Sequence, residues 1–286
     1  MTCLFVLPGI VIFCFAMIAP AILAVFYSFF DWAKINEPSF VGFTYYSRVV
    51  KDPVFWLALR NNLTFAVLTL IGQLGIGYTA AFILKSRLSK MKRLHRTAMF
   101  FPCIISSVVM SYLWILIYSK EYGVINYILR AIGLGQYAIA WLGLPDTVVP
   151  SLAVPLIWQW FGLYMVIFMG ALETIPIEIN ESAELDGASA IKRVLYIDIP
   201  LTFNTIKVAV IMCLAGIMKM FDHILVMTEG GPGNSSTVLA YYAYKVSFKF
   251  FELGYGNTIS VGIVVFSLAI TFVARRLMGI GSRHYE

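Results

Sequence analysis

Residues 63–96 read LTFAVLTLIGQLGIGYTAAFILKSRLSKMKRLHR, an apolar run followed at once by a basic run. The apolar part, residues 63–84, carries no charged residue. It is long enough to cross a hydrocarbon layer of about 30 Å as a helix, which needs about 20 residues. The basic part, residues 85–96, carries lysines and arginines and no acid. Because such residues gather on the cytoplasmic side of membrane spans, this stretch predicts both a membrane protein and its orientation.

The whole chain is too apolar for a soluble domain. Of its 286 residues, 60% are hydrophobic and only 13% are charged, whereas a soluble domain carries about 25% charged residues. Several further runs are long enough to span a bilayer. The predicted spans are residues 3–30, 63–84, 98–118, 152–172, 206–227 and 259–273. The sequence therefore predicts an all-α, polytopic membrane protein whose six transmembrane helices form a single domain over residues 1–286.

The first run lies where a signal peptide would lie. It lacks the charged start of a signal peptide, and it is longer than the apolar core of one. We therefore expect a retained N-terminal helix over residues 3–30.

Basic residues also set the orientation of the other segments. With residues 85–96 in the cytoplasm, alternation of the spans places both termini there. The C-terminal tail adds Arg275, Arg276 and Arg283 on the same side. The polar segment between the fourth and fifth spans is cytoplasmic by the same alternation. This orientation explains the net charge of +6, and no nucleic-acid partner is needed to account for it.

Motifs for catalysis and metal binding are absent from the sequence. There is no GxxxxGK[ST] loop for nucleotide phosphates, no HExxH and no GxSxG. The cysteines at positions 3, 14, 103 and 213 fall in predicted spans without CxxC spacing, which is typical of small apolar residues. We expect no catalytic residue, no metal site and no bound cofactor in this chain.

The polar segment IPIEINESAELDGASAIKRVLYIDIP, residues 175–200, has the pattern of two short helices. Asp186 and Gly187 form a turn pair between them, and apolar residues recur at helical spacing after Gly187. One interpretation is an amphipathic hairpin that rests on lipid headgroups. Acids of its first half, such as Glu178 and Glu184, would be repelled by an anionic leaflet, which favours a protein partner instead.

The same segment carries the motif of a known family. Residues 181–183 (ESA), Gly187 and residues 197–200 (IDIP) resemble the EAA motif of binding-protein-dependent ABC importer permeases, in which E-A-A-x-x-x-G is followed by I-x-L-P. The chain departs from this pattern by serine at position 182, by isoleucine at position 199, and by Asn204 where relatives often carry proline. All three are mild changes.

Other stretches resemble the carbohydrate branch of that family, the permeases of the maltose and glycerol-3-phosphate type. They are LPGIVIFCFAMIAPAILAVFYSFFDW at residues 7–32, VGFTYYSRVVKDPVFWLALRNNLTF at 41–65 and TEGGPGNSST at 228–237. The resemblance runs from about residue 5 to residue 275. It implies the type I fold of ABC importer permeases, with residues 176–200 as a cytoplasmic coupling-helix loop.

The resemblance implies that this coupling loop docks on a cytoplasmic ATPase subunit. Glu181 would pair with a basic group of the ATPase, and Ala183 and Gly187 would permit close backbone approach. For Glu181 alone, a solvated acid at a helix start is the alternative. The coupling residues expected from the motif are Glu181, Ser182, Ala183, Asp186, Gly187, Ile197 and Pro200.

The resemblance also implies the partners. They are a second, homologous permease subunit in a heterodimer, two cytoplasmic ATP-binding subunits that use ATP and Mg, and an extracytoplasmic solute-binding protein. The assembly would lie in a bacterial or archaeal cell membrane, and this chain itself would not be an enzyme.

A pathway for a sugar requires aromatic faces and hydrogen-bonding groups within the spans. Lys219 and Asp222 lie three apart on one helical face of the fifth predicted span, and they could instead neutralise each other. Trp158 and Trp160 could belong to an interfacial aromatic belt. Alignment outward from the family motifs, with the polar side chains beside them, gives the expected pathway residues Ser107, Gln159, Trp160, Leu163, Tyr164, Ile217, Lys219, Met220 and Asp222.

The sequence thus predicts a permease subunit of an ATP-driven importer for a sugar, of di- or oligosaccharide size. A permease for glycerol phosphates or another polar solute is an alternative within the same class. A passive channel would need a ring of filter groups and no ATPase docking. A polytopic membrane enzyme would need a convergent acid, base or metal set within the spans.

Overall fold

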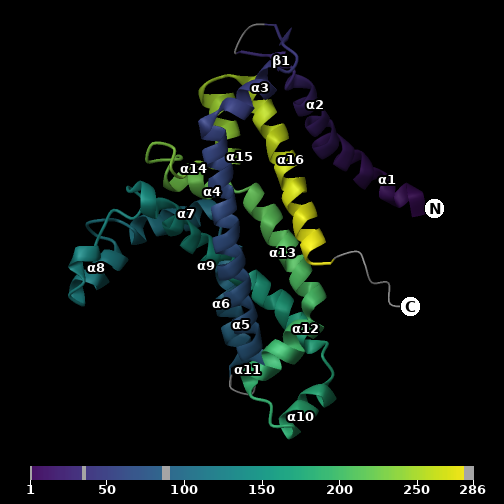
Figure 1. The fold of residues 1–286 in the computed structure, drawn as a ribbon, viewed down its shortest axis with the longest axis vertical. Helices are drawn as coiled ribbons and strands as arrows, with labels where there is room; N and C mark the ends of the chain where they lie inside the picture. The colour runs from purple at the N-terminus through teal and green to yellow at the C-terminus, as the bar shows by residue number, and fades with distance from the viewer. Residues whose placement is uncertain (1, 34–36, 86–90, 280–286) are drawn as a thin grey trace.

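A computed structural model describes residues 2–33, 37–85 and 91–279, and nearly all its elements are helices (Figure 1). The α-helices are α1 (Thr2–Phe13), α2 (Ala19–Tyr27), α3 (Thr44–Lys51), α4 (Pro53–Thr69), α5 (Gly75–Lys85), α6 (Lys92–Phe100), α7 (Ser107–Ile117), α8 (Val124–Ala131), α9 (Pro145–Glu173), α10 (Ile177–Leu185), α11 (Ala190–Arg193), α12 (Ile199–Leu201), α13 (Phe203–Met218), α14 (Asp222–Met227), α15 (Leu239–Tyr244) and α16 (Leu253–Leu277). The π-helical turns are η1 (Cys14–Ile18), η2 (Leu70–Leu74), η5 (Val194–Asp198) and η6 (Lys245–Lys249), and the 3₁₀ turns are η3 (Phe101–Ile104) and η4 (Gly135–Tyr137). Strands β1 (Phe30–Asp31) and β2 (Ser39–Phe40) form one antiparallel hairpin in which Phe30 pairs with Phe40.

Four helical segments are long and apolar enough to cross a membrane unbroken: residues 6–27, 53–85, 145–173 and 253–277. Two more candidates are bent pairs, one over residues 92–117 and one over residues 190–218. Together they give up to six spans, and the all-α polytopic fold predicted from the sequence is confirmed. Arg87, Lys90 and Arg283, which contributed to the predicted orientation, lie outside the described residues.

The second span is a continuous helical rod, residues 53–85, built from α4, η2 and α5. It begins well before the predicted residue 63, because Asp52 caps it: its Oδ1 accepts the N–H of Val54 at 2.8 Å. The rod lies along α9, and Figure 1 shows the two running through the centre of the molecule. A Cβ on Gly77 would lie 3.0 Å from the carbonyl oxygen of Phe161, so the two helices approach to backbone contact.

The third span is not the straight helix predicted over residues 98–118. Its two halves, residues 92–104 and α7, are bent by 99° relative to each other. Pro102 supplies no N–H, and the backbone of Ile105 is extended, so the helical ladder stops there and restarts at Ser107. The expectation of one continuous helix was wrong for this segment.

The fifth span also differs from the continuous helix predicted over residues 206–227. Helix α13 ends at Met218, and α14 begins at Asp222. Lys219 ends α13 with φ −98° and ψ 2°, and Phe221 has φ −139°, so the residues between the helices leave the helical path. Lys219 and Asp222 therefore do not share one helical face, which corrects that expectation.

Buried amide side chains bind backbone carbonyl groups beside the two breaks. Gln159, on α9, donates from Nε2 to the carbonyl oxygen of Ile105 at 2.9 Å, in the bend before α7. Asn62, on the rod, donates from Nδ2 to the carbonyl oxygen of Ile217 at 3.0 Å, just before the break in the fifth span. Because no water satisfies such groups in a bilayer core, these contacts make irregular backbone tolerable at this depth.

Hydrogen bonds at the N-terminal end of the rod tie it to the last helices. Oδ2 of Asp52 accepts hydrogen bonds from the hydroxyls of Tyr242 and Tyr255, both at 2.5 Å. Burial raises the pKa of this carboxyl, but the two hydroxyls and the backbone N–H groups of the helix start prevail and lower the pKa. The hairpin, α3 and α15 lie at this same end (Figure 1).

The first helical segment stands apart from the bundle. Residues 6–27 bury none of their apolar window within the chain, and α1 points away from the other helices in Figure 1. Of the helices in this segment, α2 is the one that packs against α16. This segment therefore offers its apolar surface to lipid or to another subunit.

We predict that Gly162→Ala destabilises the fold whereas Gly170→Ala does not, although both glycines lie on α9. A Cβ at Gly162 would lie 2.1 Å from the carbonyl oxygen of Met99, so α6 must move, at a cost of about 1–3 kcal/mol. Nothing lies within 4 Å of a Cβ at Gly170, and alanine gains about 1 kcal/mol over glycine in a helix. Thermal unfolding in detergent measures both, and equal shifts in the two variants would contradict the backbone contact.

Candidate functional site

A cavity of about 290 Å³ lies between the rod, α7, α9 and the broken fifth span. Trp160 and Tyr164 contribute aromatic rings from α9. Ser107 contributes a hydroxyl from the first turn of α7, and Gln73 an amide from η2. The wall thus combines aromatic faces with a few hydrogen-bonding groups, as a site for a small polar ligand does. The lining residues are Gln73, Ser107, Leu156, Trp160, Leu163, Tyr164, Met212, Cys213, Gly216, Ile217, Lys219, Met220, Phe221, Asp222 and His223.

The structure brings together all the predicted pathway residues except Gln159. Those that line the cavity are Ser107, Trp160, Leu163, Tyr164, Ile217, Lys219, Met220 and Asp222. Gln159 is only 1% exposed and binds the carbonyl oxygen of Ile105, so it supports the bend behind the cavity wall. It lies outside the cavity because successive residues of a helix point about 100° apart, so Gln159 and its neighbour Trp160 do not share a face of α9.

The break in the fifth span gives the cavity its charged groups. Lys219 and Asp222 are both exposed and line the cavity from either side of the break. No ion pair joins them, or joins either to another described residue. Both side chains are therefore available to a ligand. The irregular backbone of the break is itself tolerated in a membrane protein because it lines such a space.

Several residues of the cavity wall were not predicted from the sequence. Gln73 is the most informative, because its Nε2 donates to the carbonyl oxygen of Leu156 at 3.0 Å and so joins the rod to α9 inside the cavity wall. Cys213 donates from Sγ to Oε1 of the same glutamine at 3.5 Å. Gln73 and His223 are polar residues within predicted spans, and this polarity is the signal in the sequence that could have identified them as wall residues. The residues missed are Gln73, Leu156, Met212, Cys213, Gly216, Phe221 and His223.

A second candidate site is the coupling loop, residues 176–200, at the opposite end of the molecule from the hairpin (Figure 1). Helix α10 ends in two hydrogen bonds, from Ala188 N–H to the Ala183 carbonyl at 2.9 Å and from Gly187 N–H to the Glu184 carbonyl at 3.1 Å. Gly187 has φ +70°, which glycine adopts without strain. Ser189 then caps α11, so the loop has the two helices and the turn that the sequence predicts.

The coupling loop exposes much of its apolar surface. Leu185 is 89% exposed, Tyr196 78% and Ile191 73%. Of the residues expected from the EAA motif, Ala183 is buried within the chain and Ile197 is half-buried. The remaining motif residues are all exposed, namely Glu181, Ser182, Asp186, Gly187 and Pro200. Apolar side chains this exposed next to acids are typical of a surface that another protein covers.

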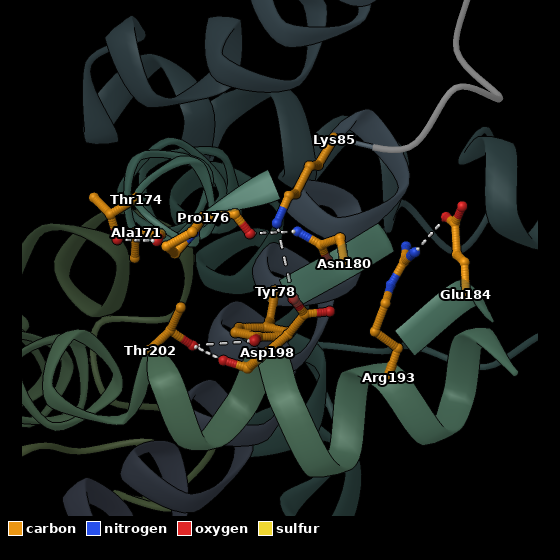
Figure 2. A network of polar contacts seen from close by, with 10 residues as sticks. All are labelled: Tyr78, Lys85, Ala171, Thr174, Pro176, Asn180, Glu184, Arg193, Asp198 and Thr202. Atoms are coloured by element: carbon orange, nitrogen blue, oxygen red, sulfur yellow. Dashed lines mark hydrogen bonds and ion pairs between the residues drawn. The ribbon is translucent and has the colours of Figure 1, made fainter. Parts of the chain in front are cut away.

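Polar contacts join the coupling loop and the start of α13 to the C-terminal end of the rod (Figure 2). Nζ of Lys85, the last residue of α5, lies 3.8 Å from Oδ1 of Asp198. About two turns earlier on α5, the hydroxyl of Tyr78 lies 3.1 Å from that of Thr202. Arg193, on α11, donates to Oε1 of Glu184 on α10 at 3.1 Å, so it also joins the two helices of the loop.

Comparisons with known proteins agree on one family. Residues 73–285 match the family described as "Binding-protein-dependent transport system inner membrane component", and the chain belongs to it. It is 35% identical to the "Probable ABC transporter permease protein YurN" of Bacillus subtilis (strain 168), over 97% of this chain and 96% of that protein. It is 32% identical to the "Lactose transport system permease protein LacF" of Rhizobium radiobacter, over 94% of this chain and 91% of that protein.

A solved structure shares the fold along nearly the whole chain. It is the crystal structure of a bacterial ABC transporter involved in the import of the acidic polysaccharide alginate, with a TM-score of 0.84 and 23% identity. The match covers 98% of this chain and 95% of that one. The type I importer permease fold and the family expected from the EAA motif are therefore confirmed.

We predict that Trp160→Ala lowers uptake of the transported solute by about tenfold to a hundredfold. Loss of an aromatic face from a ligand contact costs about 1.5–3 kcal/mol, and 1.4 kcal/mol is tenfold. The matched control is Trp158→Ala on the same helix, because Trp158 is 38% exposed, packs 5.9 Å from the ring of Trp114 and does not line the cavity. Uptake into cells that express each variant measures the effect, and equal uptake by both variants would remove Trp160 from the pathway.

Proposed function

We propose that this chain is one permease subunit of an ATP-driven importer that takes up a sugar delivered by an extracytoplasmic binding protein. The observation that carries the proposal is the cavity of about 290 Å³, where Trp160 and Tyr164 face hydroxyl and amide groups in a chain of this family. Sugar rings pack their CH faces on aromatic rings and hydrogen-bond around their edges. That LacF is named a lactose transport permease supports a di- or oligosaccharide as the solute.

A second, homologous permease would complete the cavity. Binding cavities for small molecules measure about 300–1,000 Å³, so about 290 Å³ lies at the lower limit for a disaccharide. Exposed apolar residues of α7 such as Val109, Tyr112 and Leu116 give this chain a surface that a partner helix can cover. In the heterodimer, the solute would lie between the two subunits.

The coupling loop would dock on one of two cytoplasmic ATPase subunits, and those subunits would bind the ATP and Mg. The exposed Glu181 would pair with a basic group of the ATPase, and Leu185 and Ile191 would enter its apolar cleft. Hydrolysis would then take place in that partner, and this chain would be a transport subunit without enzymatic activity of its own.

The orientation that follows places the coupling loop and both termini in the cytoplasm of a bacterial or archaeal cell. The hairpin, α3 and α15 then face outward, toward the binding protein (Figure 1). The basic residues that follow the rod, among them Lys92, Arg93 and Arg96, support this orientation.

We predict that Gly187→Val abolishes both ATPase binding and uptake. A β-branched residue is strained at φ +70°, at a cost of about 1–3 kcal/mol, and the side chain would stand in the docking surface. Gly133→Val is the matched control, because Gly133 has φ +81° and open space around it but lies beyond α8, far from the coupling loop in sequence. Co-purification with the ATPase subunit, followed by uptake of labelled disaccharide into proteoliposomes, measures both effects.

The Gly133→Val chain should bind the ATPase and import normally. Normal ATPase binding by the Gly187→Val chain would contradict the docking role of the loop. Sugar flow through the wild-type complex without ATP would instead indicate a passive channel.

A further inference from the structure

The ion pair between Lys85 and Asp198 is buried but incompletely satisfied. The side chain of Asp198 is 1% exposed and that of Lys85 is 24% exposed. Neither carboxylate oxygen of Asp198 receives a hydrogen bond from any described residue, and Nζ of Lys85 donates none to them. At 3.8 Å, the Nζ to Oδ1 distance exceeds the 2.7–2.9 Å of a charge-assisted hydrogen bond.

A loose buried pair favours a change of geometry. Taking a carboxylate and an ammonium out of water is costly, and only close contact with hydrogen bonds offsets that cost. The pair would therefore gain free energy if Lys85 and Asp198 moved together by about 1 Å. The contribution of the pair is more favourable in a conformation that closes this distance, so the pair responds to movement of the loop against the rod.

The rod offers a direct route from this pair to the cavity. Lys85 is its last residue, and Gln73 projects from η2 of the same helix into the cavity wall. Gln73 is fixed to α9 by its hydrogen bond to the Leu156 carbonyl. A π-helical turn such as η2 is a place where a helix can adjust its register, and such turns occur frequently at functional sites.

A second cation beside Asp198 also responds to the position of the loop. Arg193 lies on α11, and its guanidinium sits 5.5 Å from the ring centroid of Phe82 on α5. The Nε of Arg193 is buried without a described partner, while its Nη1 reaches Glu184. The loop thus meets α5 through two cations and one buried acid. Arg193 and Asp198 lie on the continuous segment of α11 and η5, so a shift of that segment changes both of their contacts with α5 (Figure 2).

We propose that Lys85 and Asp198 are positioning residues for transport, and that their pair transmits movement of the ATPase-docked loop along the rod to Gln73 in the cavity wall. The pair is loose in the conformation described and closes in another conformation of the transport cycle. This inference rests on the proposed function of the coupling loop. It adds to that function the specific contact by which the loop acts on the second span.

The test is a double variant, Lys85→Met with Asp198→Leu, in the complete reconstituted transporter. An apolar pair of similar volume in place of a buried ion pair is commonly neutral or stabilising, so this chain folds and assembles. Without the two charges, the double variant has no electrostatic preference between the loose and the closed arrangement of the loop and the rod. We expect normal co-purification with the ATPase, and an approximately tenfold loss of the stimulation of ATP hydrolysis by the sugar-loaded binding protein, within the range of coupling effects.

Two further variants sharpen the result. The charge-swapped chain, Lys85→Asp with Asp198→Lys, restores the pair and should regain stimulation to within about threefold of wild type. Lys51→Met removes an exposed lysine at the other end of the molecule, beside α4, and should leave stimulation unchanged.

The outcomes separate this inference from the function on which it rests. If the wild-type complex shows no ATP-dependent uptake, the proposed function fails before the variants are compared. If wild type imports sugar and the apolar double variant keeps full stimulation, the pair is only structural and the inference is overturned. A charge-swapped chain that assembles but stays unstimulated would overturn it as well.

Discussion

The backbone contact between the rod and α9 is the constraint on which the other features of this protein depend. Apolar helices gain little from burial against each other in lipid, so they associate by close packing. Gly77 permits this on the rod, where an added Cβ would lie 3.0 Å from the Phe161 carbonyl oxygen. On the neighbouring face of α9, Gly162 meets the backbone of α6. With α9 held between these two helices, Trp160 and Tyr164 are fixed at the cavity wall.

The breaks in the third and fifth spans follow from that packing. Each break frees backbone polar groups, which would be costly if exposed to lipid. Helix α9 provides a buried amide for this purpose, Gln159 at the Ile105 carbonyl. Asn62 of the rod adds a hydrogen bond to the Ile217 carbonyl, which also accepts the backbone N–H of Met220. The cavity lies where the two breaks come together, because Ser107 starts the helix after one and Lys219 ends the helix before the other. The packing of the rod on α9 thus accounts for both the irregular backbone and the cavity.

The sequence predicted the parts of this arrangement that depend on local composition. Apolar length gave the spans, and the Asp186-Gly187 turn was readable because only glycine adopts a positive φ freely. The breaks were not predictable in the same way. Prolines are tolerated in membrane helices, so Pro102 alone did not signal a bend of 99°. Residues 219–221 contain neither proline nor glycine, so nothing local marked the end of α13.

Long-range contacts explain the remaining differences. Gln159 was predicted to face a ligand because of its type, but its orientation depends on the freed carbonyl of Ile105, on another span. Gln73 was not predicted as a wall residue, because its place in the wall depends on the packing of η2 against Leu156. The motif of the coupling loop was recognisable, yet the pairing of Asp198 with Lys85 joins segments that no local pattern connects.

The two ends of the rod differ in how firmly their charged residues are held. Asp52 at its N-terminal end and Lys85 at its C-terminal end both suit the helix dipole, so each charge is favourable where it stands. Asp52 is held firmly by the hydroxyls of Tyr242 and Tyr255 at 2.5 Å. The side chain of Lys85 is paired only loosely among the described residues, with a carboxylate 3.8 Å away. A helix that is held more firmly at its N-terminal end than at its C-terminal end yields first at the C-terminal end, beside the coupling loop. The cavity lies between the two ends, so under the proposed mechanism movement of the loop would displace the cavity wall while the contacts of Asp52 brace the rod.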